Sequence, residues 1–127
     1  MKIAQIAKNS STNVLITLFA VSVIAAMVSI ELHAESSKPT WSNSLVVDVR
    51  TENEFNEKHH PDSINVPLSE IQKGNIDAFK NTDKEFIVVV CRTGQRAATA
   101  IKYLENQNLK AKLENYSSFE YLSTLEK

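Results

Sequence analysis

The residues of this sequence best suited to chemistry lie in one short run, Cys91-Arg92-Thr93-Gly94-Gln95-Arg96. A cysteine thiolate is a strong nucleophile, and arginine guanidinium groups supply permanent charge and paired N–H donors for an oxyanion. Gly94 is one of only two glycines in the chain, and glycine permits a positive φ or the close approach of a ligand. The run therefore predicts a nucleophile, Cys91, within a substrate-binding loop made of Arg92, Thr93, Gly94, Gln95 and Arg96.

The segments on either side of this run indicate how it is positioned. Residues 86–90 are apolar on both faces, as in the central strand of a parallel sheet that is covered on both sides. Residues 97–106 predict a helix, because apolar residues recur along one face. The run then joins the carboxyl end of a strand to a helix N-terminus, where backbone N–H groups and the helix dipole stabilise a thiolate. The simpler interpretation is an ordinary turn with a core cysteine and two solvated arginines, but it leaves this clustering of residue types unexplained.

Strands and helices alternate along the rest of the chain. We expect a strand at residues 45–49 from its β-branched run, a short strand at residues 64–66, and a last strand at residues 111–114. Helices or helical turns are expected at residues 52–58, 69–71, 76–79 and 118–125, with Thr51 as the N-cap of the first. This alternation predicts the α/β class, with a single domain built on a mainly parallel sheet that helices flank on both faces.

Composition excludes several other classes of protein. The chain has 127 residues, which suits one domain, and its net charge of −1 offers no basic surface for nucleic acid. Its single cysteine cannot form an intramolecular disulfide or a four-thiolate zinc site. We therefore expect neither a nucleic-acid partner nor a metal centre.

The N-terminal segment has the pattern of an export signal. Lys2 and Lys8 precede an uncharged run from Val14 to Ile30, and the small residue Ala34 follows. Residues 1–34 are predicted to be a signal peptide, or an uncleaved anchor that would contact a membrane only through residues 14–30. A polar linker at residues 35–43 then leads to a domain at residues 44–127. Both forms of the signal place the domain outside the cytoplasm, in the periplasm.

The run resembles the active-site loop of rhodanese-like domains, which has the form Cys91-x-x-Gly94-x-Arg96 in this sequence. The first half of the domain is similar to that family as well, in the segments Val47-Asp48-Val49-Arg50, Glu54-Phe55, His59, Pro61 and Ile64-Asn65-Val66-Pro67. Lys58, Asp62 and the pair Ser117-Ser118 stand where the family has glycines. With its export signal, the chain is most similar to the single-domain periplasmic members of this family.

The resemblance implies a sulfurtransferase. In this family the cysteine takes the outer sulfur of an anionic donor such as thiosulfate, and sulfite leaves. A persulfide on Cys91 would then pass the sulfur to a thiophilic acceptor, with no metal or organic cofactor.

Three other classes of function stay open. Phosphatases and arsenate reductases have loops of the form Cys-x5-Arg, whereas this chain has Cys-x4-Arg, a smaller cradle that favours a single sulfur atom over a tetrahedral phosphate. A non-enzymatic binding domain with the same fold would lack the cysteine. A thiol-redox protein would need a second cysteine to resolve its intermediates.

Partners are also expected for the charged residues around the loop. The guanidinium of Arg96 is expected to be held by backbone carbonyls, and that of Arg92 to face solvent and meet the incoming anion. Asp48 and Arg50 are expected to tie the end of the first strand to neighbouring backbone.

The remaining polar and aromatic residues suit structural roles better than catalysis. His59 and His60 fit a turn with one ring packed and one exposed, which we favour over an acid–base pair or a metal site. Simple packing roles are expected for Trp41 and Phe55. A solvated helix face is expected for the acidic residues at positions 52, 54 and 57.

Overall fold

A computed structural model describes residues 12–24 and 37–127, which fall in two compact units, Met1–Ser37 and Lys38–Lys127. In the first unit, residues 12–24 form a helix with exposed side chains. The remainder of the predicted signal segment, including Lys2, Lys8, Ala34 and residues 25–30 of its apolar run, lies outside the described residues. Within the described ranges, no helix is long and apolar enough to cross a membrane.

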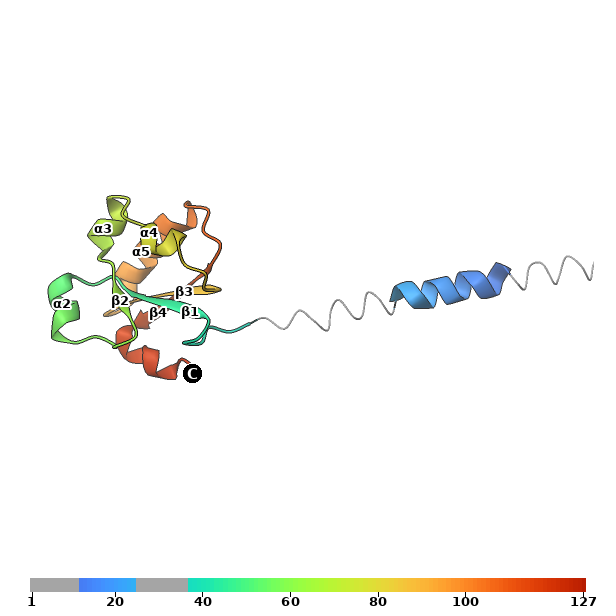
Figure 1. Ribbon diagram of the computed structural model, residues 1–127, viewed down its shortest axis with the longest axis horizontal. Coiled ribbons are helices and arrows are strands. Elements are labelled where there is room, and N and C mark those ends of the chain that lie inside the picture. The colour runs from blue at the N-terminus through green and yellow to red at the C-terminus, as the bar shows by residue number, and fades with distance from the viewer. Residues whose placement is uncertain (1–11, 25–36) are drawn as a thin grey trace, which may run out of the picture. The chain divides into compact units, whose positions relative to one another are not determined.

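The second unit is built on a four-stranded parallel sheet, which confirms the predicted α/β class (Figure 1). Its strands lie in the order β2-β1-β3-β4, and every neighbouring pair runs parallel. They span Ser44–Asp48 (β1), Ile64–Asn65 (β2), Phe86–Cys91 (β3) and Lys112–Ser118 (β4). All six residues of β3 are buried, as expected for a central strand with both faces covered.

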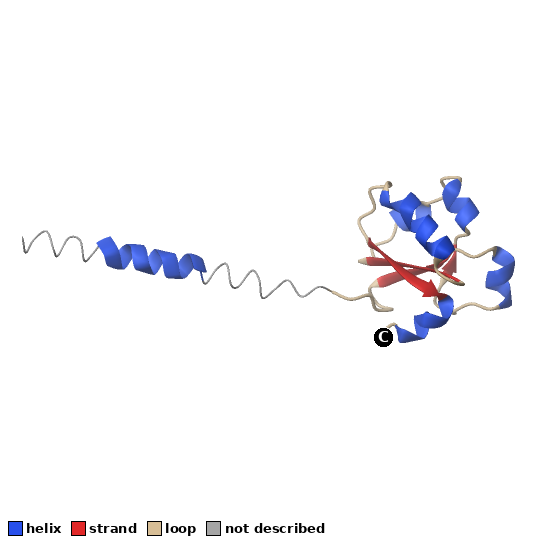
Figure 2. Ribbon diagram, turned by 180° about the vertical axis from the view of Figure 1, so that it is seen from behind, coloured by secondary structure: helices blue, strands red, loops and turns tan. Residues whose placement is uncertain are grey.

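Helices flank the sheet on both faces, but unequally (Figures 1 and 2). One face is covered by α3 (Leu68–Gln72), α4 (Asp77–Lys80) and α5 (Gln95–Glu105). The other is covered by a single 3₁₀ helix, η1 (Phe119–Thr124), together with Trp41. The helix α2 (Glu52–Glu57) lies beyond the end of β1 and has no buried residue.

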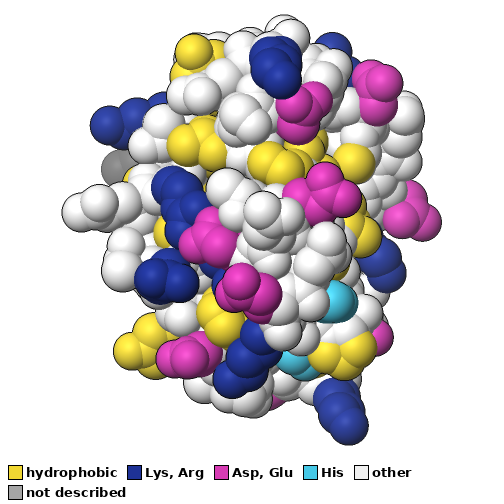
Figure 3. Space-filling view, turned by 90° about the vertical axis from the view of Figure 1, so that its left-hand side faces the viewer, with side chains coloured by type: hydrophobic (Ala, Val, Ile, Leu, Met, Phe, Trp, Pro, Cys, Tyr) yellow, Lys and Arg dark blue, Asp and Glu magenta, His cyan; other side chains and the backbone are white. Residues whose placement is uncertain are grey.

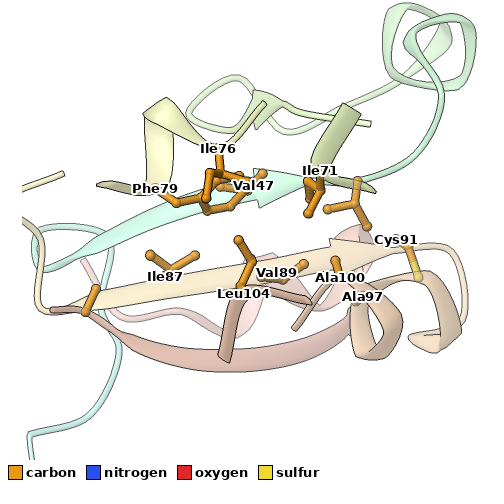
Figure 4. Packing of buried hydrophobic residues seen from close by; sticks show 12 residues of the cluster. Val47, Ile71, Ile76, Phe79, Ile87, Val89, Cys91, Ala97, Ala100 and Leu104 are labelled. Carbon is orange, nitrogen blue, oxygen red and sulfur yellow. The ribbon is translucent and has the colours of Figure 1, made fainter. Parts of the chain in front are cut away.

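The larger core lies between the sheet and α3, α4 and α5, and it reaches Cys91 (Figure 4). Side chains alternate along β3, so that Ile87, Val89 and Cys91 enter this core while Val88 and Val90 face η1. Cys91 therefore projects to the side of the sheet on which α5 packs. The helix lines this core with Ala97, Ala100 and Leu104.

The C-terminal elements differ from the predicted ones. Strand β4 was expected to end at residue 114 but runs to Ser118, with a register shift opposite residues Val89 and Cys91. Ser117 takes a left-handed backbone conformation, with φ 57°, and its N–H donates to Oδ1 of Asn115 at 2.8 Å. The last helix is a 3₁₀ helix capped by Ser118, whose Oγ accepts from the N–H of Glu120.

The part of the predicted linker from Lys38 onward lies within the second unit and contacts its C-terminal end. Thr40 forms a bridge with Glu126, and the N–H of Trp41 donates to the carbonyl of Glu126 at 2.9 Å. Trp41 also packs against the core that η1 covers. The boundaries at residues 35–43 and 44–127 stay predictions.

Candidate active site

Cys91 is the last residue of β3, and its thiol lies under the loop that leads into α5. Only 1% of the residue is exposed. Its Sγ accepts a hydrogen bond from the backbone N–H of Gly94 at 3.0 Å. In Figure 4 the sulfur lies at the strand end, beside Ala97 in the first turn of α5. The strand and the helix thus place the thiol at the carboxyl edge of the sheet, where parallel α/β folds form their sites.

Gly94 is required in this loop for two independent reasons. It is the N-cap of α5, with φ 89°, a conformation that L side chains rarely adopt. A Cβ placed on Gly94 would also approach Cα and Oγ of Ser117 to 3.1 Å, closer than nearly all real Cβ contacts. The carbonyl of Gly94 accepts from Nδ2 of Asn115 at 3.2 Å, so β4 holds the loop from the other side.

The start of α5 presents several backbone donors close to Cys91. In the described part of the chain, the N–H groups of Arg92, Thr93, Gln95 and Arg96 have no protein acceptor. The first N–H groups of a helix point outward from its end and carry partial positive charge. These donors are available to an anion, and binding of an anion by the loop stays a prediction.

Arg96 is held differently from the prediction. Its Nη1 and Nη2 donate to Oε2 and Oε1 of Glu54 at 2.7 and 3.0 Å, in a paired arrangement between residues 42 positions apart. The expectation that backbone carbonyls hold this guanidinium was wrong, and so was the expectation that Glu54 is a solvated residue of α2. A carboxylate fits the planar fork of arginine with two parallel bonds, which single carbonyls cannot provide.

The electrostatics of this pair reinforce its geometry. The hydrogen bonds from Arg96, and then that from the backbone N–H of Thr51, hold the pKa of the Glu54 carboxyl well below its usual range. The pKa of Arg96 is raised above its ordinary value, first by its hydrogen bond to Glu54 and further by the charges of Glu54, Cys91 and Asp48. Both groups are therefore charged at neutral pH.

The other side chains of the loop face outward. Arg92 exposes 71% of its side chain, and its Nη2 lies 3.9 Å from Oε1 of Glu54. Thr93 and Gln95 are also exposed. The structure thus places the N–H of Gly94 against the Cys91 thiol and the guanidinium of Arg96 against Glu54. It leaves Arg92 at the surface, where the sequence analysis expected it.

Comparison with known proteins decides the family. The profile of the rhodanese-like domain matches residues 30–120, well over half of the chain. The chain belongs to the rhodanese-like domain family.

Individual relatives agree with this assignment. The chain is similar to the adenylyltransferase and sulfurtransferase MOCS3 of Drosophila grimshawi, at 39% identity over 67 residues, which cover 50% of this chain but only 15% of that protein. It is similar in structure to a rhodanese-like domain protein from Staphylococcus aureus, with a TM-score of 0.50, 27% identity, and coverage of 70% of this chain and 78% of that one. The human single-domain sulfurtransferase TSTD1 shares the fold, with a TM-score of 0.50 at 20% identity over 68% of this chain and 97% of that one.

A second arginine–carboxylate pair of the rhodanese-like domain lies at the end of β1. Nε and Nη2 of Arg50 donate to the carboxylate of Asp48 at 2.7 to 3.0 Å, and Nη2 also reaches the carbonyl of Lys58 at 2.7 Å. The guanidinium lies 4.0 Å from the ring centroid of Phe119. As predicted, these residues tie the end of β1 to neighbouring backbone, here the C-terminal end of α2.

The two histidines of the rhodanese-like domain have packing roles. His59 stacks on Phe55 with ring centroids 3.8 Å apart, and its Nδ1 lies 2.6 Å from the carbonyl of Phe55. His60 stacks on Trp41 at 4.2 Å. His59 is exposed and His60 is half-buried, so the expected turn with structural roles fits both rings.

Two cavities lie on the end of the rhodanese-like domain that α2 occupies. A cavity of about 350 Å³ includes Arg92 in its wall, with the other lining residues Arg50, Glu54, Glu57, Lys58 and Ser118–Glu120. A larger one of about 600 Å³, lined by residues such as Glu52, Asn56 and Asn65, contains no residue of the Cys91 loop. Basic and acidic side chains interleave on this end of the molecule (Figure 3). The smaller cavity is the better candidate for substrate, because it adjoins the loop.

One residue of this site, Glu54, was not singled out from the sequence. A local signal was present, since Thr51-x-x-Glu54 is a capping box and the structure forms both of its hydrogen bonds. The resemblance to the family also included Glu54. Neither signal indicates a contact with Arg96, which depends on where the fold places the start of α5 relative to α2.

Proposed function

We propose that this protein is a sulfurtransferase that carries sulfane sulfur as a persulfide on Cys91. The observation that carries the proposal is the backbone N–H of Gly94 donating to Sγ of Cys91 at 3.0 Å. That contact puts the sulfur at the N-terminus of α5, where backbone N–H groups stabilise anionic sulfur. The family supports a role in sulfur transfer, and the relatives from Drosophila grimshawi and human are both named as sulfurtransferases.

The first half-reaction loads the cysteine. The Cys91 thiolate attacks the outer sulfur of an anionic donor such as thiosulfate, and a new S–S bond forms. The S–S bond of the donor breaks, and sulfite leaves with the electron pair. Free N–H groups of residues Arg92, Thr93, Gln95 and Arg96 are available to stabilise the outer persulfide sulfur.

The second half-reaction unloads it. A thiophilic acceptor, for example cyanide, attacks the outer sulfur and leaves as thiocyanate, which regenerates the Cys91 thiolate. The reaction needs no net proton transfer, so the site requires no general base. This is consistent with the packing roles of His59 and His60.

Arg92 is proposed to draw the donor to the loop. It is exposed, and it forms part of the wall of the 350 Å³ cavity, which has room for a small anion. Arg96 is less available to attract the donor, because its charge is paired with Glu54. Attraction of the donor and shaping of the loop are thus assigned to different arginines.

Export of the protein is part of the proposal. Lys2, Lys8 and the apolar run at residues 14–30 support a signal peptide or anchor, with the domain in the periplasm. By this reading the protein is similar to phage shock protein E, the exported single-domain rhodanese. Fractionation that finds full-length protein in the soluble cytosol would contradict export without affecting the chemistry.

The test is a comparison of native protein with Cys91→Ser. Native protein should convert thiosulfate and cyanide to sulfite and thiocyanate, and Cys91→Ser should be inactive with an unchanged thermal unfolding curve. Retained turnover in Cys91→Ser would overturn the mechanism. Hydrolysis of p-nitrophenyl phosphate by native protein, without thiosulfate activity, would favour a phosphatase instead.

A further inference from the structure

Glu54 joins the start of α5 to the start of α2 through side-chain hydrogen bonds. Its carboxylate accepts two hydrogen bonds from Arg96, on the first turn of α5. The same carboxylate accepts from the backbone N–H and the hydroxyl of Thr51, each at 3.0 Å, at the start of α2. One carboxylate thereby fastens the end of α5 that follows Cys91 to the helix that follows β1.

Core packing does not fix α2 in place, so this link matters for its position. None of the residues Glu52–Glu57 is buried. At its far end, α2 is held by the hydrogen bond from Arg50 to the carbonyl of Lys58. At its near end, α2 is held by the contact between Glu54 and Arg96. The exposed fractions of these two side chains are 23% and 34%.

The two arginines of the loop differ in their contact with Glu54. Arg96 lies two residues after Gly94, whose N–H donates to Sγ of Cys91. A change in the position of Arg96 therefore moves the N–H groups around the thiol. The charge of Arg96 is balanced by Glu54, whereas Arg92 stands 3.9 Å from the carboxylate and is mostly exposed.

We infer that Glu54 is a positioning residue for sulfur transfer, because it holds Arg96 and thereby keeps the Cys91 loop closed around the thiol. This inference rests on the proposed function for its kinetic consequence. Its structural consequence does not: without the pair, the loop opens more often and Cys91, which is buried in the native protein, becomes more accessible.

Glu54→Gln isolates this role from helix capping. Glutamine is as good as glutamate at the third position of a capping box, so the contact with the N–H of Thr51 is kept. What is lost is the charged, paired contact with Arg96, together with the longer contact with Arg92 at 3.9 Å. Glu52→Gln is the matched control, because Glu52 lies on the same helix, is exposed, and carries the same charge without touching the loop.

Two measurements are made on native protein and both variants. The first is steady-state sulfur transfer from thiosulfate to cyanide, for which Glu54→Gln should lower kcat roughly tenfold and change KM by less than about threefold. The second is the rate of Cys91 alkylation by iodoacetamide, followed by intact mass, at a pH high enough to ionise the thiol in every variant. That plateau rate should rise at least about fivefold in Glu54→Gln, because it reports loop opening. Glu52→Gln should match native protein in both.

The outcomes separate this inference from the proposed function. A fall in kcat together with faster alkylation supports the inference, and Glu54→Asp, which keeps the charge on a shorter side chain, should then be intermediate. Alkylation equal to that of native protein overturns it, whatever the kinetics. Faster alkylation with unchanged kcat also overturns it, since the loop would then not limit transfer. If native protein transfers no sulfur, the proposed function fails, and the alkylation rates alone decide whether Glu54 holds the loop.

Discussion

Two arginine–carboxylate pairs of the domain, Asp48–Arg50 and Glu54–Arg96, differ in burial and in the elements that they join. The pair Asp48–Arg50 is almost completely buried, with 0% and 4% of the two side chains exposed. The pair Glu54–Arg96 lies partly at the surface and connects helices α2 and α5. Burial makes the Asp48–Arg50 pair costly to break, while the role that we propose for the Glu54–Arg96 pair is to hold the start of α5. Similar hydrogen-bonding patterns thus occur in two settings, and we propose a role in stability for the buried pair and a role in sulfur transfer for the partly exposed one.

The charged groups of the pair Asp48–Arg50 have hydrogen-bond partners, which explains how the pair is tolerated in the core. The backbone N–H of Arg50 also donates to Asp48, its Nη2 reaches the carbonyl of Lys58, and its face stacks on Phe119. Among the described residues, no buried side-chain nitrogen or oxygen lacks a partner. Removing one charge would leave the other buried without compensation.

The largest expected effect follows from breaking the buried pair. Asp48→Asn keeps the shape of the side chain but leaves the charge of Arg50 unpaired, so the free energy of unfolding should fall by about 3–5 kcal/mol. Urea denaturation at neutral pH measures this, with Asp83→Asn, an exposed residue, as the control for the charge change. A loss below about 1 kcal/mol would mean that the pair Asp48–Arg50 contributes little to the free energy of unfolding.

The next effect tests the loop itself through the two glycines of the chain. Gly74 and Gly94 have nearly the same φ, 91° and 89°, but only Gly94 has a neighbour that a Cβ would strike. Gly74→Ala should cost about 1 kcal/mol from the left-handed backbone alone. Gly94→Ala should cost more, about 2–3 kcal/mol, and should also abolish sulfur transfer, because the loop must shift away from Ser117. Equal losses in the two variants would show that the contact with Ser117 has no effect.

The third effect is kinetic and compares the two arginines of the loop. Arg92→Lys keeps the charge but loses the planar fork, so KM for thiosulfate should rise roughly threefold to tenfold with a smaller change in kcat. Arg96→Lys cannot make both bonds to Glu54, so it should mainly lower kcat. Steady-state kinetics at fixed ionic strength distinguish them. The reverse pattern would exchange the two assigned roles.

The smallest effect is the contribution of the pair Glu54–Arg96 to the pH dependence of stability. The pKa of Glu54 is lowered in the folded protein from the ordinary value of 4.5, chiefly by Arg96. The unfolded chain therefore binds a proton at this residue before the folded chain does, and the free energy of unfolding falls as pH drops below about 4.5. Glu54→Gln should flatten this part of the stability profile, measured by urea denaturation between about pH 5 and about pH 3. An unchanged slope would mean that other carboxyls, such as Glu70, account for it.

The sequence was sufficient for the fold class and for the position of the loop. The apolar run at residues 86–90 and the helical period after it identified the central strand and α5, since both signals are local. Strand β4 was predicted too short because its last residues, Asn115 to Ser118, carry no β-branched or aliphatic side chain. The partner of Arg96 was missed because the pairing with Glu54 arises only when α2 and α5 meet in three dimensions.

Intact mass spectrometry of the protein after exposure to thiosulfate tests the central claim most directly. The account predicts a mass increase of one sulfur atom in native protein, removal of that increase by cyanide, and no increase in Cys91→Ser. A native protein that gains no mass, or a Cys91→Ser variant that gains the same mass, would contradict a persulfide on Cys91.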